Sequence, residues 1–135
     1  GMPWARVMHQ VEIMRPLPGR MNCLAGEGRQ PTAVIDHART PAELEEVLMT
    51  LRGHLHGRLY CVLVGAGGSR EDLARVGHAL ADRLFETTRR RRSQAIREAL
   101  RLAGPGDIVL IAGAARGRWL QRGEAEVRSL MEEAA

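Results

Sequence analysis

Residues 59–68 read Leu-Tyr-Cys-Val-Leu-Val-Gly-Ala-Gly-Gly, an apolar run that ends in a glycine-rich segment. A continuous apolar run of this length is typical of a strand that is covered on both faces, as in a parallel sheet. Residues 108–112, Ile-Val-Leu-Ile-Ala, form a second such run, which Gly113 follows. The two runs predict a buried sheet at the centre of the fold, with helices on both of its faces.

The chain around these two strands alternates between strand and helix patterns. Shorter strands are expected at residues 21–25, 33–36 and 83–87. Apolar residues at helical spacing predict four helices, with these inner faces: Leu44, Val47, Leu48, Leu51; Leu73, Val76, Gly77, Leu80; Ile96, Ala99, Leu100, Ala103; and Val127, Leu130, Met131, Ala134. The alternation predicts an α/β fold of three layers, Rossmann-like, in which helices flank a mostly parallel sheet.

The first of these helices has a clear start signal. Thr40 is expected as the N-cap, Pro41 as the first helical residue, and Glu43 as the residue that reaches back to complete a capping box. Gly53 and Gly57 are expected to end the helix.

A chain of 135 residues fits one domain with a core of its own. The spacing of Val7, Met8, Val11 and Met14 predicts a further helix over residues 4–15. We therefore divide the chain into a leading helix or linker, residues 1–17, and one domain, residues 18–135.

Several features bear on the compartment. The longest strongly apolar stretch, residues 108–115, is too short to span a bilayer, and no export segment opens the sequence. Cys23 and Cys61 lie in expected strands without metal-type spacing, and we predict a pair of buried, reduced thiols. We expect a cytoplasmic location and no contact with a membrane.

All 20 basic residues are arginine, and the net charge is +4. Without lysine the chain cannot form a Walker A loop, whose lysine reaches the β- and γ-phosphates, and it cannot form a lysine Schiff base. The base composition of the genome is an alternative explanation of the all-arginine balance. The charge is modest and is compatible with an anionic ligand.

Ligands of a parallel sheet bind at the carboxyl ends of its strands, which places the candidate site at the turns 36–41, 65–70 and 113–118. Helix N-termini at such turns favour anions. Arginines at positions 39, 70, 116 and 118 suit the recognition of carboxylate or phosphate. The alternative is that these arginines are solvated and bind nothing.

Four strings in a fixed order resemble the C-terminal domain of the Mur ligases, over about residues 15–135. They are Pro18-Gly19-Arg20-Met21, Asp36-His37-Ala38-Arg39-Thr40-Pro41, Gly65-Ala66-Gly67-Gly68 and the stretch Gly-Asp-Ile-Val-Leu-Ile-Ala-Gly at 106–113. The nearest likeness is to members that add the third residue of the UDP-MurNAc-peptide precursor of peptidoglycan. The resemblance implies a ligase that activates a carboxylate as an acyl-phosphate with ATP and Mg²⁺ and then forms an amide.

The second string is similar to a family loop, Asp-Tyr-Ala-His-Asn/Thr-Pro, that faces the nucleotide and the acyl-phosphate. Here His37 stands where the family has Tyr, and Arg39 stands where it has His. The resemblance implies that Asp36, Arg39 and Thr40 face the nucleotide or a phosphate. An arginine can meet a phosphate, but it cannot act as the imidazole does.

Two further motifs differ more. The resemblance implies substrate-binding roles for Arg70 in the glycine loop, and for Gly113 and Arg116 in the fourth motif, of which only Ala112 and Gly113 are kept. The Asp-Asn-Pro-Arg motif and the insertion after it are gone, because residues 86–93 run Glu-Thr-Thr-Arg-Arg-Arg-Arg-Ser. We therefore expect no selection of diaminopimelate or lysine.

The four consecutive arginines at 89–92 have two interpretations. The first is a phosphate-contacting patch, and the second is a solvated helix start or a shortened scar of the lost insertion. We favour the second because the chain has few aromatic residues on which bases could stack. We expect no nucleic-acid partner. His54 and His56 flank a loop, and we predict no metal site.

Two hypotheses for function remain. In the first, the chain is the acceptor-side domain of an ATP-dependent amide ligase, or is derived from one. We then expect no catalytic residue and no cofactor in this chain, because ATP and Mg²⁺ are implied only if the missing domains exist. Its partner is then a UDP-MurNAc-peptide or an amino acid. In the second, it is a stand-alone, non-catalytic binding module that uses its arginine rim for an anionic ligand or a protein partner.

Overall fold

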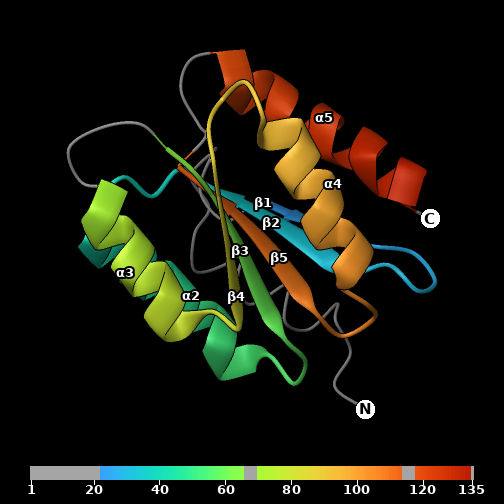
Figure 1. Cartoon of the computed structure of the whole chain (residues 1–135). Coiled ribbons are helices and arrows are strands. Elements are labelled where there is room, and N and C mark those ends of the chain that lie inside the picture. The colour runs from blue at the N-terminus through green and yellow to red at the C-terminus, as the bar shows by residue number, and fades with distance from the viewer. Residues whose placement is uncertain (1–21, 66–69, 114–117, 135) are drawn as a thin grey trace.

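The computed structural model describes residues 22–65, 70–113 and 118–134, and from residue 118 to 122 it describes the backbone alone. Five strands form one sheet: β1 (Asn22–Leu24), β2 (Thr32–Asp36), β3 (Leu59–Val64), β4 (Arg83–Thr87) and β5 (Ile108–Ala112). Four helices of the described residues flank it: α2 (Pro41–His54), α3 (Arg70–Leu80), α4 (Arg92–Leu102) and α5 (Arg118–Ala134). Helices α2 and α3 cover one face of the sheet, and α4 and α5 cover the other (Figure 1). The expected three-layer α/β fold is confirmed.

The strand order is β1-β2-β5-β3-β4. Strand β5 pairs in parallel with both β2 and β3, and β3 pairs in parallel with β4. Strand β1 is the antiparallel member, with Asn22 opposite Ile35 and Leu24 opposite Ala33. The sheet is therefore mostly parallel, and its carboxyl edge carries the ends of β2, β5, β3 and β4.

Alternate residues of the central strands divide the core into two parts, because successive side chains of a strand point to opposite faces. On β3, Tyr60, Val62 and Val64 pack beneath α4 and α5, whereas Leu59, Cys61 and Leu63 pack beneath α2 and α3. Every residue of β2, β3 and β5 is buried. The continuous apolar runs of the sequence reflect this coverage on both faces.

The start of α2 follows the expected capping pattern with one difference. The Thr40 hydroxyl accepts a 3.2 Å hydrogen bond from the Glu43 N–H, and Pro41 is the first helical residue. The Glu43 carboxylate, however, accepts its 3.0 Å bond from the Arg39 N–H rather than from the N-cap residue. The reciprocal bond is shifted by one residue, so the same glutamate fixes the backbone of Arg39.

The predicted end of α2 was wrong for Gly53, which lies inside the helix. The helix continues to His54 and stops because Leu55 adopts an extended backbone, with its N–H bonded to the Arg52 carbonyl. Gly57 has another role: a Cβ there would lie 2.3 Å from the Gly106 carbonyl oxygen. That glycine is needed for a close approach of two loops rather than for helix termination.

An ionic contact joins α2 to the loop that follows α3. The Asp82 carboxylate accepts a 2.7 Å hydrogen bond from the Leu59 N–H and a 3.0 Å bond from the Arg52 guanidinium. The same guanidinium donates to the Leu80 carbonyl at 2.9 Å. These bonds lower the pKa of Asp82, chiefly through the Leu59 N–H.

Both cysteines are present as thiols, but only Cys61 is fully buried. Cys23 is half-buried, which corrects the expectation of two buried thiols, because β1 is an edge strand. Burial raises the pKa of Cys61 to about 12. The predicted leading helix at 4–15 lies outside the described residues. In the part of the chain that the structure describes, no helix has the length and apolar character needed to cross a membrane.

Candidate functional site

The ends of β2 and β5 meet at the carboxyl edge of the sheet. Asp36, the last residue of β2, is paired with Ala112 and is only 2% exposed. Its carbonyl accepts a 3.2 Å hydrogen bond from the Gly113 N–H, directly after β5. Two of the residues predicted for the site, Asp36 and Gly113, are therefore brought together by the main chain.

Gly113 also brings the end of β3 into this group. Its φ is 82°, and a Cβ at this position would lie 2.4 Å from the Val64 carbonyl oxygen. A side chain is excluded here by the backbone conformation and by the lack of space. The turn after β5 can therefore pass between the ends of its two neighbours, β2 and β3.

The ends of β3 and β4 are joined in the same way, because the Gly65 N–H donates a 3.1 Å bond to the Thr87 carbonyl. The helix after β3 runs to one face of the sheet and the helix after β4 runs to the other (Figure 1). The helices that follow β2 and β3 likewise lie on one face, whereas α5, which follows β5, lies on the other. At such switch points of a parallel sheet, the loops part and leave room for a ligand.

Arg39 and Thr40 lie directly after β2 on this edge, and both are exposed. The Arg39 N–H donates to the Glu43 carboxylate, and the Thr40 hydroxyl accepts from the Glu43 N–H, at the start of α2. The Thr40 hydroxyl already accepts the capping bond, but its proton remains available to an acceptor. The local arrangement thus presents a hydroxyl and a guanidinium at the N-terminal end of a helix, where anions are favoured.

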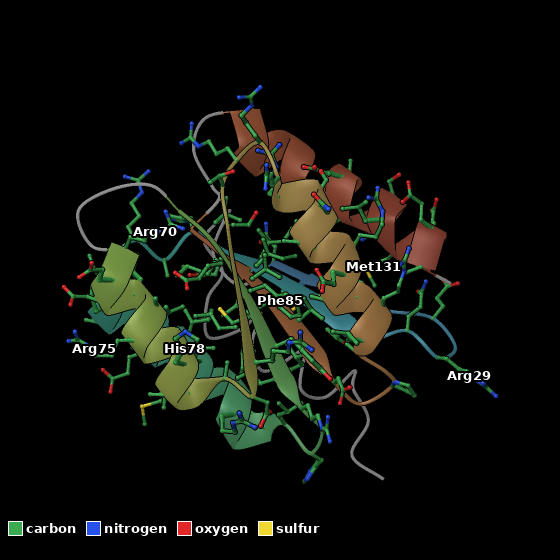
Figure 2. All side chains as sticks on the ribbon, viewed as in Figure 1. Arg29, Arg70, Arg75, His78, Phe85 and Met131 are labelled. Carbon is green, nitrogen blue, oxygen red and sulfur yellow. The ribbon has the colours of Figure 1, made fainter. Side chains whose placement is uncertain are left out.

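Arg70 begins α3 and lies on the same edge (Figure 2). Its Nε is 3.9 Å from a carboxylate oxygen of Glu86, on β4, and about half of its side chain is exposed. A pair this long and this exposed contributes little to stability, so the guanidinium can turn to another anion at small cost. Glu86 was not predicted for the site, since the pairing depends on the register of β4 beside β3.

The four consecutive arginines divide into two groups. Arg92, the first residue of α4, bonds Glu126 of α5 at 3.2 Å, and the Ser93 hydroxyl donates to the same carboxylate. Positions 89–91 precede the helix and are exposed, and the N-cap Arg91 makes no side-chain capping bond. Arg92 therefore joins α4 to α5, and the other three agree with the predicted solvated helix start.

Some of the predicted site lies outside the described residues. Arg116 is among them, as are residues 66–69 of the glycine loop and 114–117 of the turn after β5. The backbone of Arg118 is described as the first residue of α5. Asp36, Arg39, Thr40, Arg70 and Gly113 are thus the predicted site residues for which the structure gives an arrangement.

The described residues do not by themselves fit a complete site for a nucleotide and Mg²⁺. The chain has no lysine to reach the terminal phosphates of a nucleotide. Among residues 22–65, 70–113 and 118–134, no group of three or more His, Cys, Asp or Glu side chains is placed to hold a metal ion. Arg39, Thr40 and Arg70 are suited to contact a phosphate, but they do not make a complete nucleotide site.

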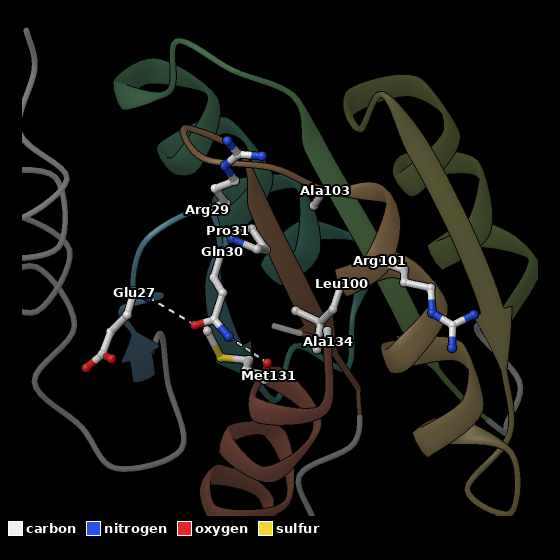
Figure 3. Close-up of a pocket in the computed structure, with 9 residues that line it drawn as sticks. All are labelled: Glu27, Arg29, Gln30, Pro31, Leu100, Arg101, Ala103, Met131 and Ala134. Atoms are coloured by element: carbon white, nitrogen blue, oxygen red, sulfur yellow. Dashed lines mark hydrogen bonds between the residues drawn. The ribbon is translucent and has the colours of Figure 1, made fainter.

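Sequence reasoning missed a cavity of about 360 Å³ at the opposite, amino edge of the sheet. It lies between the β1–β2 loop and the ends of α4 and α5 (Figure 3). Its lining residues lie far apart in the sequence, and no motif marks them.

The family described as "Mur ligase, glutamate ligase domain" matches residues 19–115. The chain is 35% identical over 141 residues to UDP-N-acetylmuramoyl-L-alanyl-D-glutamate--2,6-diaminopimelate ligase of Xylella fastidiosa, which covers 81% of this chain and 28% of that protein. It is 32% identical over 163 residues to the enzyme of the same name from Xanthomonas campestris, covering 97% of this chain and 32% of the relative. The second alignment is longer than the chain, so that relative carries segments that are missing here.

A solved structure gives the same result for the fold. The structure of a UDP-N-acetylmuramoyl-L-alanyl-D-glutamate--2,6-diaminopimelate ligase matches with a TM-score of 0.68 and 23% identity, covering 87% of this chain and 32% of that one. The chain thus spans about a third of the length of the proteins that it matches. With the family match extending from Gly19 to Ala115, the chain belongs to the Mur ligase family, as its glutamate ligase domain.

Proposed function

We propose that the chain is the acceptor-side, C-terminal domain of an ATP-dependent amide ligase of peptidoglycan precursor synthesis, or is derived from one, and is not catalytic by itself. The chain matches about a third of the length of relatives that are named as UDP-N-acetylmuramoyl-L-alanyl-D-glutamate--2,6-diaminopimelate ligases, and this match supports the proposal. The proposed location is the cytoplasm. The proposed boundaries are a leading helix or linker at 1–17 and the domain at 18–135, and the start of the family match at residue 19 favours them.

The convergence of strand ends on Gly113 is the observation that carries this proposal. It sets the buried Asp36 and the exposed Arg39 and Thr40 on one edge of the sheet with Arg70. In our proposal Asp36, Arg39 and Thr40 face the nucleotide or acyl-phosphate held by other domains. Arg70, Gly113 and Arg116 face the UDP-MurNAc-peptide or the incoming amino acid. ATP and Mg²⁺ would then be held mainly outside this chain.

The edge can be tested by titrating the 135-residue chain with UDP-MurNAc-L-Ala-D-Glu while amide chemical shifts are followed. We expect saturable shifts at residues 65 and 113 and smaller shifts at residues 36–41. Arg70→Gln should weaken binding several-fold, because it removes the cation assigned to this substrate. Arg39→Gln should have a smaller effect, because Arg39 is assigned to the nucleotide or acyl-phosphate. Arg75→Gln, an exposed site on α3, is the matched control and should leave binding unchanged. Shifts confined to other surfaces would contradict the proposed site.

A second candidate function is a stand-alone, non-catalytic module that binds an anionic ligand or a protein partner. The exposed arginines at 70 and 89–91 on the same edge favour it. The two functions are separated by the mass of the native product, measured by immunoblot against this domain. A band several-fold heavier than the mass of the 135-residue chain supports the ligase. A band of the chain's own size supports the module and contradicts a role as one domain of a larger ligase.

A further inference from the structure

The cavity at the amino edge of the sheet has the size of a small-molecule site. Its volume of about 360 Å³ lies within the range of roughly 300–1,000 Å³ that is usual for ligand pockets. It is lined by Glu27, Arg29, Gln30, Pro31, Leu100, Arg101, Ala103, Met131 and Ala134. In Figure 2, Arg29 and Met131 lie far from Arg70, so this cavity is separate from the carboxyl edge.

Hydrogen bonds hold one wall of the cavity in place. The Gln30 side-chain amide donates a 2.6 Å bond to the Met131 carbonyl and accepts a 3.0 Å bond from the Glu27 N–H (Figure 3). The Thr32 N–H bonds the Asp107 carbonyl at 3.1 Å, which fixes the end of the same loop. At Gly26 a Cβ would lie 2.2 Å from the Pro31 carbonyl oxygen, so the loop closes tightly on itself. The cavity is therefore formed before any ligand arrives.

The floor of the cavity is apolar. Leu100, Ala103 and Met131 are buried residues of the core beneath α4 and α5, and Pro31 is buried beside them. Figure 3 shows Leu100, Met131 and Ala134 close together at the centre of the lining residues. An aliphatic group placed against these side chains would lose contact with water, which favours its binding.

The charged side chains that line the cavity favour an anion, because two arginines stand against one glutamate. Arg29 comes from the loop and Arg101 from α4, and both side chains are exposed. In Figure 3 their guanidinium groups point away from Leu100, so each must turn to meet a ligand in the cavity. Glu27 is the acidic member of the lining. A second cavity of about 300 Å³ shares Glu27, Gln30 and Met131 with the first, but it has Glu27 and Glu132 against Arg128 and does not share this balance. The carbonyl ends of α4 and α5 both oppose an anion. Arg101 in the last turn of α4 offsets the first field, whereas the last turn of α5 carries no basic residue.

We propose that this cavity binds a small ligand that joins an aliphatic body to one carboxylate. The aliphatic body lies on Leu100, Met131 and Ala134, and the carboxylate lies between Arg29 and Arg101, where charge-assisted hydrogen bonds hold it. Two sources carry this chemistry, a free aliphatic acid and the C-terminal residue of a peptide. The site is independent of the ligase function and of the carboxyl edge.

The test is a titration of the chain, followed by amide chemical shifts, with hexanoate and with N-acetyl-leucine at millimolar concentrations. Hexanamide and N-acetyl-leucinamide are their neutral counterparts. We expect saturable shifts at residues 29–31, 100–103 and 131–134 for at least one of the two acids. The neutral counterpart should bind about fivefold more weakly or worse, because it cannot pair with a guanidinium. The tighter of the two acids identifies the source.

Three variants test the assignment of residues. Ala134→Trp should fill the cavity and abolish binding, whereas Ala125→Trp, on an exposed position of the same helix, should not. The double variant Arg29→Gln/Arg101→Gln should weaken the binding of the two acids and leave the binding of the neutral compounds unchanged. Circular dichroism checks that each variant is folded. The proposal is overturned if neither acid gives saturable shifts, if the neutral compounds bind equally well, or if a folded Ala134→Trp variant binds as before.

Discussion

Gln30 caps the last turn of α5, because its side-chain amide donates a 2.6 Å hydrogen bond to the Met131 carbonyl. The last carbonyls of a helix have no partner within the helix. Here the partner comes from a residue 101 positions earlier, in the loop between β1 and β2. The contact joins the first described loop of the domain to its last helix.

Gln30→Ala should lower the free energy of unfolding by about 1 kcal/mol, because it leaves a part-buried carbonyl without its partner. Urea denaturation measures the change. Gln94→Ala, at an exposed position of α4, is the control and should have little effect. Equal stability of the two variants would show that the cap contributes nothing.

Gly113→Ala should destabilise the domain by about 2 kcal/mol or more, since it combines a positive φ with a Cβ 2.4 Å from the Val64 carbonyl oxygen. Gly65→Ala is the matched control at the end of the neighbouring strand, because a Cβ there would meet nothing within 4 Å. Thermal unfolding of both variants decides the point. A Gly113→Ala protein as stable as Gly65→Ala would contradict the close approach.

Asp82→Asn should remove a stabilisation that depends on pH. Hydrogen bonds, first that from the Leu59 N–H and then that from Arg52, lower the pKa of Asp82 in the folded protein below its usual 3.8. A carboxyl group with a lowered pKa stabilises the fold above the unfolded pKa and loses this effect as the pH falls through the folded value. The free-energy difference between wild type and variant should therefore be constant near neutral pH and shrink below about pH 4.

Urea denaturation of both proteins from pH 7 to pH 3 measures that difference. Glu45→Gln, on an exposed position of α2, controls for the loss of one negative charge. A difference that stays constant across the acid range would rule out the contribution of Asp82.

Cys61 should resist thiol reagents in the folded protein at pH 8. Burial raises its pKa to about 12, so the reactive thiolate is scarce, and the side chain is fully covered. In a Cys23→Ser variant, dithionitrobenzoate should react only after urea is added. A Cys61→Ser variant reports the half-buried Cys23 separately. Rapid reaction of the Cys23→Ser protein without urea would contradict the burial of Cys61.

The sequence predicted the central strands well. The runs at 59–64 and 108–112 coincide with β3 and β5, because a strand covered on both faces must be apolar throughout. The bounds 83–87 also coincide with β4, although this edge strand is partly exposed. Gly53 misled the helix prediction, because glycine weakens a helix without having to end it. The order of strands was not predictable, since no local pattern states that β5 lies between β2 and β3.

The candidate site was predictable to the extent that topology alone determines it. Asp36 and Gly113 share an edge because parallel strands end on the same side of a sheet. The contacts of Arg70 with Glu86 and of Arg92 with Glu126 depend on how separate elements lie beside one another, which the sequence does not state. The amino-edge cavity depends on the same packing and escaped prediction for that reason.

The central place of β5 has a consequence for how the domain is made. The edge of β2 that pairs with β5 has no partner until residues 108–112 have left the ribosome, because β5 lies between β2 and β3. A nascent chain that ends before this strand exposes two apolar strand edges, and such edges invite pairing with other chains. The last part of the sheet to be synthesised therefore completes its interior, so fragments cut before residue 108 should aggregate rather than fold.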